Sequence, residues 1–361
     1  MEWKGGTMRR SIHYLLVLCL LLLGASIQPG KTAAAAACPA EGCSIFLPLV
    51  MKPRPVLHLG LVTTAGGSVD DNGYNDMAWQ AVQDAETNLG SIGAYIESAS
   101  TQDYTANINT FISQGSDLII TIGWDMADAT QAAALAHPGQ KFTIADYLYT
   151  PQLSNVLSQV YASEQTAFLC GYIAAGMTHS GVVATLGGMN ISTVTQFMHG
   201  YSQGVTYYNQ HKGATVQVLG TNSFAGSFNN FSAGYNLALG FINQGADVIF
   251  PVAGSTGMGA AQAVEENAGT WLIGVDTDWK IQYPLYANVV LTSAMKNVRA
   301  STYAVIKKVY QGTFSGGTYL GTLANEGVSV GSYATAVPQA LRNEVDQVKA
   351  LIMNGSIVVT P

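Results

Sequence analysis

Apolar and polar positions form two alternating patterns along this chain. Near-continuous apolar runs rich in β-branched residues are typical of strands in parallel sheets covered on both faces. Between them, apolar residues recur at helical spacing. The expected strands are residues 56–63, 94–99, 118–123, 141–146, 182–188, 216–222, 248–253, 271–276 and 288–294. The expected helices are residues 75–89, 127–136, 164–177, 192–211, 234–243, 258–268 and 297–310.

This alternation predicts an α/β fold with doubly wound parallel sheets. So many strands favour two sheets over one. We expect a first lobe of residues 55–161 plus 287–316 and a second lobe of residues 162–286 plus 317–361. The carboxyl ends of the strands in both lobes would then face a common cleft, where ligands of α/β proteins bind.

The first 37 residues predict a signal peptide. Basic residues precede a short apolar run, and an alanine-rich stretch follows. The run is too short for a good transmembrane helix. We therefore expect an exported protein, in the periplasm or at the outer face of the cytoplasmic membrane, with residues 38–54 as a tail. Cys38 is a candidate lipidation site, and the alternative is ordinary cleavage with Cys38 paired to Cys43.

Composition excludes two further classes of protein. With 48% hydrophobic and 10% charged residues and a formal net charge of −7, the chain is neither disordered nor a basic nucleic-acid binder. Four cysteines are too few for a disulfide scaffold of this size. In its apolar helical segment, Cys170 is expected to be buried and inert.

Motifs for catalysis are incomplete. Ser255 follows a strand and precedes a helix, as the nucleophile of many hydrolases does. A catalytic triad in the order Ser, Asp, His would need a histidine after Ser255, but all six histidines precede it. Gly257 and Gly259 with Asp276 downstream match only part of a dinucleotide-binding fingerprint. Zinc-protease, C-x-x-C and P-loop motifs do not occur in the sequence. We expect a protein that is not an enzyme and that uses no cofactor or metal.

Polar and aromatic side chains gather instead at predicted strand ends. Several of them converging on one cleft would form a pocket with aromatic walls and a few polar groups. A single aspartate at a strand end is more often a helix cap or turn residue. The candidates for ligand binding are Asp71, Tyr74, Asn75, Trp124, Asp146, Phe228, Gly254, Asp276 and Lys296.

Blocks around these residues resemble the basic membrane lipoprotein family, also called PnrA-like, whose members are solute-binding proteins of ABC importers. The resemblance covers residues 56–330, with the blocks in order. Its main blocks read Asp71-Asn-Gly-Tyr-Asn75, Gly187-Gly-Met189, Gly226-Ser-Phe228, Gly274-Val-Asp276 and Thr292-Ser-Ala-Met-Lys296. The sequence departs from the family in having Tyr74 for Phe, Gly73 for Ser and Asn230 for Asp, and in the bulk of Trp124 and Trp279.

The resemblance implies a type I periplasmic-binding-protein fold without catalysis and a purine nucleoside as ligand. Tyr74 and Phe228 would enclose the base. Asp146 and Asn75 would accept hydrogen bonds from its N–H groups. The ribose would bind Asp276 and Lys296, close to the backbone of Gly254.

We therefore expect an extracytoplasmic solute-binding protein of an ABC importer, carrying a purine nucleoside or related base. Its partners would be the small-molecule ligand and the importer's permease subunits, not nucleic acid. The protein would be a monomer that associates with the membrane only if its N-terminus is lipidated. A ligand-sensing surface protein of the same fold is the alternative function, followed by an enzyme on a Rossmann-like scaffold.

Overall fold

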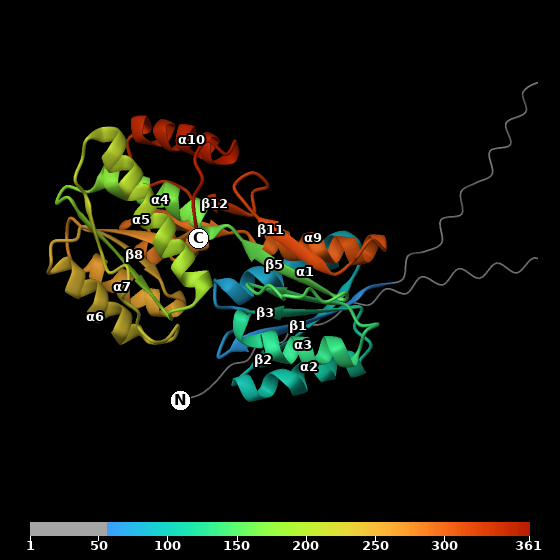
Figure 1. Cartoon of the computed structure of the whole chain (residues 1–361). Coiled ribbons are helices and arrows are strands. Elements are labelled where there is room, and N and C mark those ends of the chain that lie inside the picture. Colours follow the sequence, from blue (N-terminus) through green and yellow to red (C-terminus); the bar gives the residue numbers. More distant parts are fainter. Residues whose placement is uncertain (1–55) are drawn as a thin grey trace, which may run out of the picture. The chain divides into compact units, whose positions relative to one another are not determined.

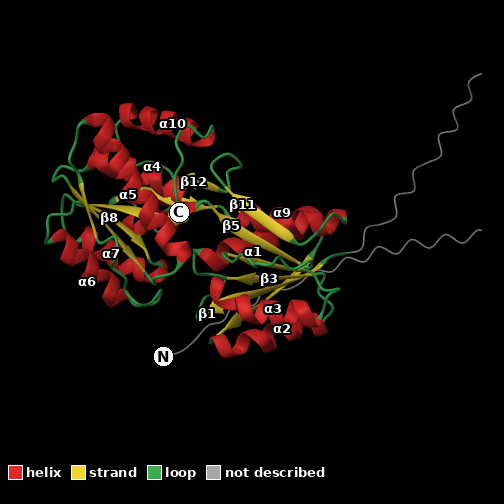
Figure 2. Ribbon diagram, viewed as in Figure 1, coloured by secondary structure: helices red, strands yellow, loops and turns green. Residues whose placement is uncertain are grey.

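Two six-stranded sheets, each with helices on both faces, organise residues 56–361, the part of the chain that the computed structural model describes (Figures 1 and 2). This arrangement confirms the expected α/β fold with two parallel-sheet lobes. The expected signal peptide, the tail, Cys38 and Cys43 lie outside the described residues.

The first lobe is built on an all-parallel sheet. In spatial order its strands are β11 (Gly317–Gly321), β5 (Val156–Tyr161), β4 (Phe142–Ala145), β3 (Leu118–Ile122), β1 (His58–Ala65) and β2 (Ile92–Ser98). One face packs against α1 (Tyr74–Leu89) and α9 (Val298–Gln311). The other packs against α2 (Tyr104–Ser113) and α3 (Ala127–Ala136).

The second lobe repeats this plan. In spatial order its strands are β12 (Val328–Val330), β10 (Val290–Lys296), β9 (Trp271–Asp276), β8 (Val248–Val252), β6 (Val182–Gly187) and β7 (Gln217–Leu219). Only the β10–β12 pair of this sheet is antiparallel. One face packs against α4 (Ser163–Met177) and α5 (Ser192–Lys212), and the other against α6 (Phe231–Ile242) and α7 (Gly257–Glu265). Outside α4 lies α10 (Gln339–Met353) (Figure 1).

Burial explains why these segments form these elements. The central strands β3, β4 and β8 are buried along their whole length, as strands covered on both faces must be. Helix α1 instead buries one stripe, including Met77, Ala78, Val82 and Ala85, and keeps its other face polar. Cys170 is a buried free thiol, and burial raises its pKa.

The expected crossings between the lobes need correction at two of three points. The first lies as expected near Tyr161, between β5 and α4. The strand expected at 288–294 for the first lobe is β10, which pairs with β9 in the second. The chain therefore crosses after Lys296 rather than near Tyr286. It crosses back only after Gly321, because β11 pairs with β5 in the first lobe. A buried parallel strand has the same sequence pattern in either sheet, so the pattern did not distinguish them.

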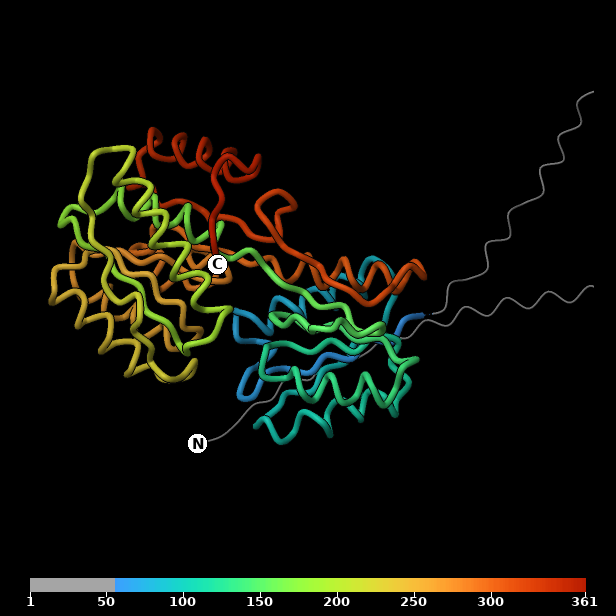
Figure 3. Tube along the Cα trace, viewed as in Figure 1, coloured from blue at the N-terminus to red at the C-terminus, as the bar shows by residue number. Residues whose placement is uncertain are grey.

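The three crossings are neighbours in space. The amide of Ala162 donates to the carbonyl of Gly321, and that of Asn297 donates to the carbonyl of Gly327. Figure 3 shows the green chain of the first crossing beside the orange-red chain of the later ones. The two lobes are therefore joined by three adjacent connections.

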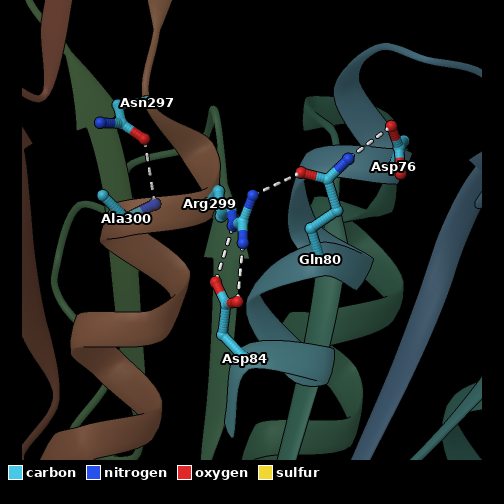
Figure 4. Close-up of polar contacts among 6 residues, drawn as sticks. All are labelled: Asp76, Gln80, Asp84, Asn297, Arg299 and Ala300. Atoms are coloured by element: carbon cyan, nitrogen blue, oxygen red, sulfur yellow. Dashed lines mark hydrogen bonds and ion pairs between the residues drawn. The ribbon is translucent and has the colours of Figure 1, made fainter. Parts of the chain in front are cut away.

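Helix α9 returns to the first lobe and is fastened to α1 by a polar chain (Figure 4). Arg299 donates from Nε and Nη2 to the two carboxylate oxygens of Asp84, at 2.6 and 2.7 Å. Its Nη1 also donates to Gln80, whose amide donates to Asp76. At the start of α9, the side chain of Asn297 accepts from the Ala300 amide and caps the helix. The contact fixes α1, which begins with two candidate ligand-binding residues.

Candidate ligand-binding site

A cavity of about 380 Å³ lies between the carboxyl ends of the strands of the two sheets. Its volume is in the range of small-molecule sites. All nine candidates line it, namely Asp71, Tyr74, Asn75, Trp124 and Asp146 from the first lobe and Phe228, Gly254, Asp276 and Lys296 from the second. The structure therefore brings together every candidate that the sequence predicted, while their contacts with a ligand stay a prediction.

Strand ends position the charged members of this set. Asp146 directly follows β4, Asp276 ends β9 and Lys296 ends β10. Both aspartates have left-handed backbone conformations, with φ of 62° and 66°. Residues other than glycine adopt this region infrequently, and such conformations gather at functional sites.

Lys296 is the centre of a buried charged cluster. Its Nζ lies 2.7 Å from Asp146 Oδ2, across the cleft, and 3.8 Å from Asp276 Oδ1. Only 5% of the Lys296 side chain is exposed. Burial by itself would lower the pKa of Lys296, but the two carboxylates outweigh that effect and the pKa is raised. The lysine is therefore held as a cation that links the two lobes.

Asp276 has a carboxylate oxygen that lies at ion-pair distance from Lys296 but accepts no hydrogen bond within residues 56–361. Its Oδ1 is buried and accepts no hydrogen bond from the described residues. Burial raises the pKa of Asp276, and the nearby Lys296 only partly opposes this. A buried acceptor without a hydrogen bond is costly, so a ligand donor at this point would remove a penalty.

Asp71 and Asn75 serve mainly to order the loop before α1. One oxygen of Asp71 accepts from the amides of Gly73 and Asp76, and the other accepts from Asn75 Nδ2 at 2.9 Å. Asn75 Oδ1 accepts from the amide of Thr64 at 3.1 Å. The amide oxygen expected to receive a base N–H thus already has a partner within the protein.

Aromatic rings form much of the remaining wall. Tyr74 begins α1 and lies with its ring centroid 5.6 Å from Lys296 Nζ. Burial raises the pKa of its hydroxyl, and the charge of Asp146 adds to this. Phe228 lies against the backbone of Gly254, whose φ of 53° is readily adopted by glycine. Trp124 is 38% exposed, whereas Trp279 is buried and bonded to the Val275 carbonyl.

Several lining residues were not among the candidates. They include Thr64, Asp125, Phe197 and Tyr283. Asp125 comes three residues after the buried strand β3, much as Asp146 and Asp276 lie at the ends of their strands, so the same positional signal was present. Phe197 lies in the second turn of α5, and helical spacing alone does not separate it from the core.

The partial catalytic motifs have structural explanations. The histidines of residues 56–361 are absent from the lining of this cavity, so Ser255 has no histidine there to activate it. Gly259 meets the backbone of Phe231, where a Cβ atom would lie 2.0 Å from a carbonyl oxygen. It therefore allows α6 and α7 to approach each other.

Two sheet-based lobes joined by three crossings around one cavity define a two-lobed ligand-binding protein. Solved structures with this fold include an ABC transporter solute-binding protein from Aeropyrum pernix, with a TM-score of 0.75 and 24% identity over 84% of this chain and 94% of that one. A second, from Conexibacter woesei, has a TM-score of 0.69 and 19% identity over 84% and 99%.

Sequence comparison then identifies the family. The model for PnrA-like ABC transporter substrate-binding proteins matches residues 59–360, so the chain belongs to this family. The chain is similar to the ABC transporter nucleoside-binding protein BmpA of Lactococcus lactis, with 32% identity over 85% of this chain and 90% of the relative. Basic membrane protein A2 of Borrelia garinii is 30% identical over 88% and 93%. The resemblance to the basic membrane lipoprotein family is thereby confirmed.

Proposed function

We propose that this protein is the extracytoplasmic solute-binding component of an ABC importer and binds a purine nucleoside, or a related base, in the cavity between its lobes. The observation that carries this proposal is the lining. Tyr74 of the first lobe and Phe228 of the second share one cavity with the buried cluster around Lys296. Aromatic faces suit a planar base, and carboxylates suit the N–H and O–H groups of a nucleoside.

Each candidate residue has a role in this proposal. Tyr74 and Phe228 stack on the base, with Trp124 at the exposed side of the cavity. Asp146 and Asn75 hydrogen-bond the base edge, and Asp71 orients Asn75. The ribose hydroxyls bind the Asp276–Lys296 pair and lie close to the Gly254 backbone. The similarity to a lactococcal nucleoside-binding protein supports this assignment.

Location and partners follow from the same proposal. The mature protein is exported, acts as a monomer and delivers its ligand to the permease subunits of the importer. Cys38 is the candidate site of a lipid anchor. Residues 56–361 include no helix with the length and apolar character that a membrane span requires.

Ligand-induced stabilisation tests the function. Nucleosides, free bases and sugars would be screened for their effect on the melting temperature, followed by calorimetry on the compounds that act. At about 100 times its Kd, a ligand stabilises the folded state by about 2.7 kcal/mol. We expect purine nucleosides to raise the melting temperature most. Stabilisation by sugars or other solutes, with no response to any purine compound, would overturn the proposal.

A further inference from the structure

A buried tyrosine behind the cavity fixes the orientation of Asp125. The Tyr104 hydroxyl oxygen accepts a hydrogen bond from the amide of Ala65 at 2.7 Å and is also bonded to Asp125 Oδ2. A backbone amide can only donate, so the single hydroxyl hydrogen of Tyr104 points to Asp125. Tyr104 is 2% exposed and has little freedom to turn away.

This arrangement leaves one carboxylate oxygen of Asp125 for the cavity. Oδ2 accepts from Tyr104, while Oδ1 accepts no hydrogen bond from residues 56–361. Asp125 lines the cavity and is partly exposed. An ionised carboxylate only accepts hydrogen bonds, so Asp125 offers an acceptor held in place from behind.

The sheet order places this acceptor beside the proposed base contacts. Strand β3, which leads to Asp125, lies between β4, which leads to Asp146, and β1, which leads to the loop before Asn75. The two neighbouring groups already have partners, since Asp146 Oδ2 is bonded to Lys296 and Asn75 Oδ1 to Thr64. Asp125 therefore adds to this row a carboxylate oxygen, Oδ1, that accepts no hydrogen bond from the described residues.

We infer that Asp125 is a specificity-determining residue that accepts a hydrogen bond from an exocyclic amine of the base. The inference rests on the proposed function and narrows its ligand to aminopurine nucleosides. Guanosine has a 2-amino group that inosine lacks, and adenosine has a 6-amino group that purine riboside lacks. We expect the protein to bind at least one amino compound about tenfold more tightly than its counterpart.

The Tyr104 contact makes Asp125→Asn an informative variant. The Tyr104 hydrogen will hold the asparagine oxygen, so the NH2 group will face the cavity in place of Oδ1. A donor then meets the amine, and the preference for the amino compound should be lost. In the double variant Asp125→Asn with Tyr104→Phe, the asparagine can rotate and present its oxygen, which should restore part of the preference. A purely structural role for Asp125 predicts no such rescue.

Calorimetry on both ligand pairs gives the ratio of Kd values for each protein. Asp128→Asn is the matched control, because Asp128 is exposed on α3 and does not line the cavity. Melting temperatures will show that the variants fold. The inference is supported if the preference for the amino compound is lost in Asp125→Asn, is kept in Asp128→Asn and returns in part in the double variant. If purine nucleosides bind but Asp125→Asn leaves both ratios within about twofold, the inference is overturned alone. If none binds the unmutated protein, the proposed function falls with it.

Discussion

At the scale of single residues, position was predictable and pairing was not. Asp146, Asp276 and Lys296 follow apolar runs, and this is enough to place them at the carboxyl edge of a sheet. That Lys296 would bond Asp146 more closely than Asp276 depends on how two sheets face each other. The hydrogen bond from the Thr64 amide to Asn75 could not be predicted either, because local sequence does not specify contacts that form on folding.

The buried Oδ1 of Asp276, which accepts no hydrogen bond from the described residues, predicts a difference between nucleosides and free bases. Asp276→Asn should weaken nucleoside binding by about 1.5–3 kcal/mol, since a charged acceptor for the ribose is lost. Binding of the matching free base should change little. Calorimetry with guanosine and guanine would measure both. Equal losses for the two ligands would remove the ribose assignment.

The same substitution should stabilise the ligand-free protein at neutral pH. Because burial raises the pKa of Asp276, the folded state binds its proton more readily than the unfolded state. The associated stability is complete below the unfolded pKa of about 3.9 and is lost as pH rises through the higher folded value. Asn mimics the protonated form. The gain in melting temperature should thus be present at pH 7 and shrink toward pH 4; a gain independent of pH would contradict this explanation.

At the scale of elements, the helix ranges expected from the sequence agree closely with the structure, but α2 and α10 were missed. Buried residues recur at helical spacing in both, for example Tyr104, Ile108 and Phe111 in α2. What the spacing could not reveal is how closely α4 and α5 pack. A Cβ atom at Gly204 would lie 1.9 Å from the carbonyl oxygen of Phe168. The glycine therefore sets the distance between the two helices, a property of their contact and not of either sequence.

This contact predicts opposite effects for two glycine substitutions. Gly204→Ala should destabilise the protein by about 3 kcal/mol or more, because the helices must separate or strain. Gly240→Ala is the matched control, since Gly240 lies in α6 of the same lobe and a Cβ there meets nothing within 4 Å. It should stabilise by about 0.5–1 kcal/mol through helix propensity. Urea unfolding would measure both, and similar values would show that the close approach is unimportant.

At the scale of the whole molecule, two lobes around a cleft were predictable from the number of apolar strands, but the last two crossings were not. The cavity that results has four carboxylates, from Asp71, Asp125, Asp146 and Asp276, and a single ammonium group, from Lys296. That cation already has carboxylate partners, so no positive charge is left for a phosphate.

Nucleotides should therefore be poor ligands. We expect guanosine 5′-monophosphate to bind at least about tenfold more weakly than guanosine, because a phosphate would enter an acidic, partly desolvated space. Titrations at low and high salt would show the difference narrowing as salt screens the repulsion. Comparable affinities at low salt would mean that the phosphate projects out of the cavity.

The interleaved crossings also affect how the chain can be made. Residues 56–161 supply most of the first lobe, but its edge strand β11 arrives only at Gly317–Gly321, and α9, which covers α1, arrives shortly before. A growing polypeptide therefore exposes the edge of β5 and the bare face of α1 until more than 300 residues have been synthesised. The lobe that is begun first is completed almost last. Completion of the first lobe must therefore wait until nearly the whole chain has been synthesised, an order that is compatible with the export proposed above.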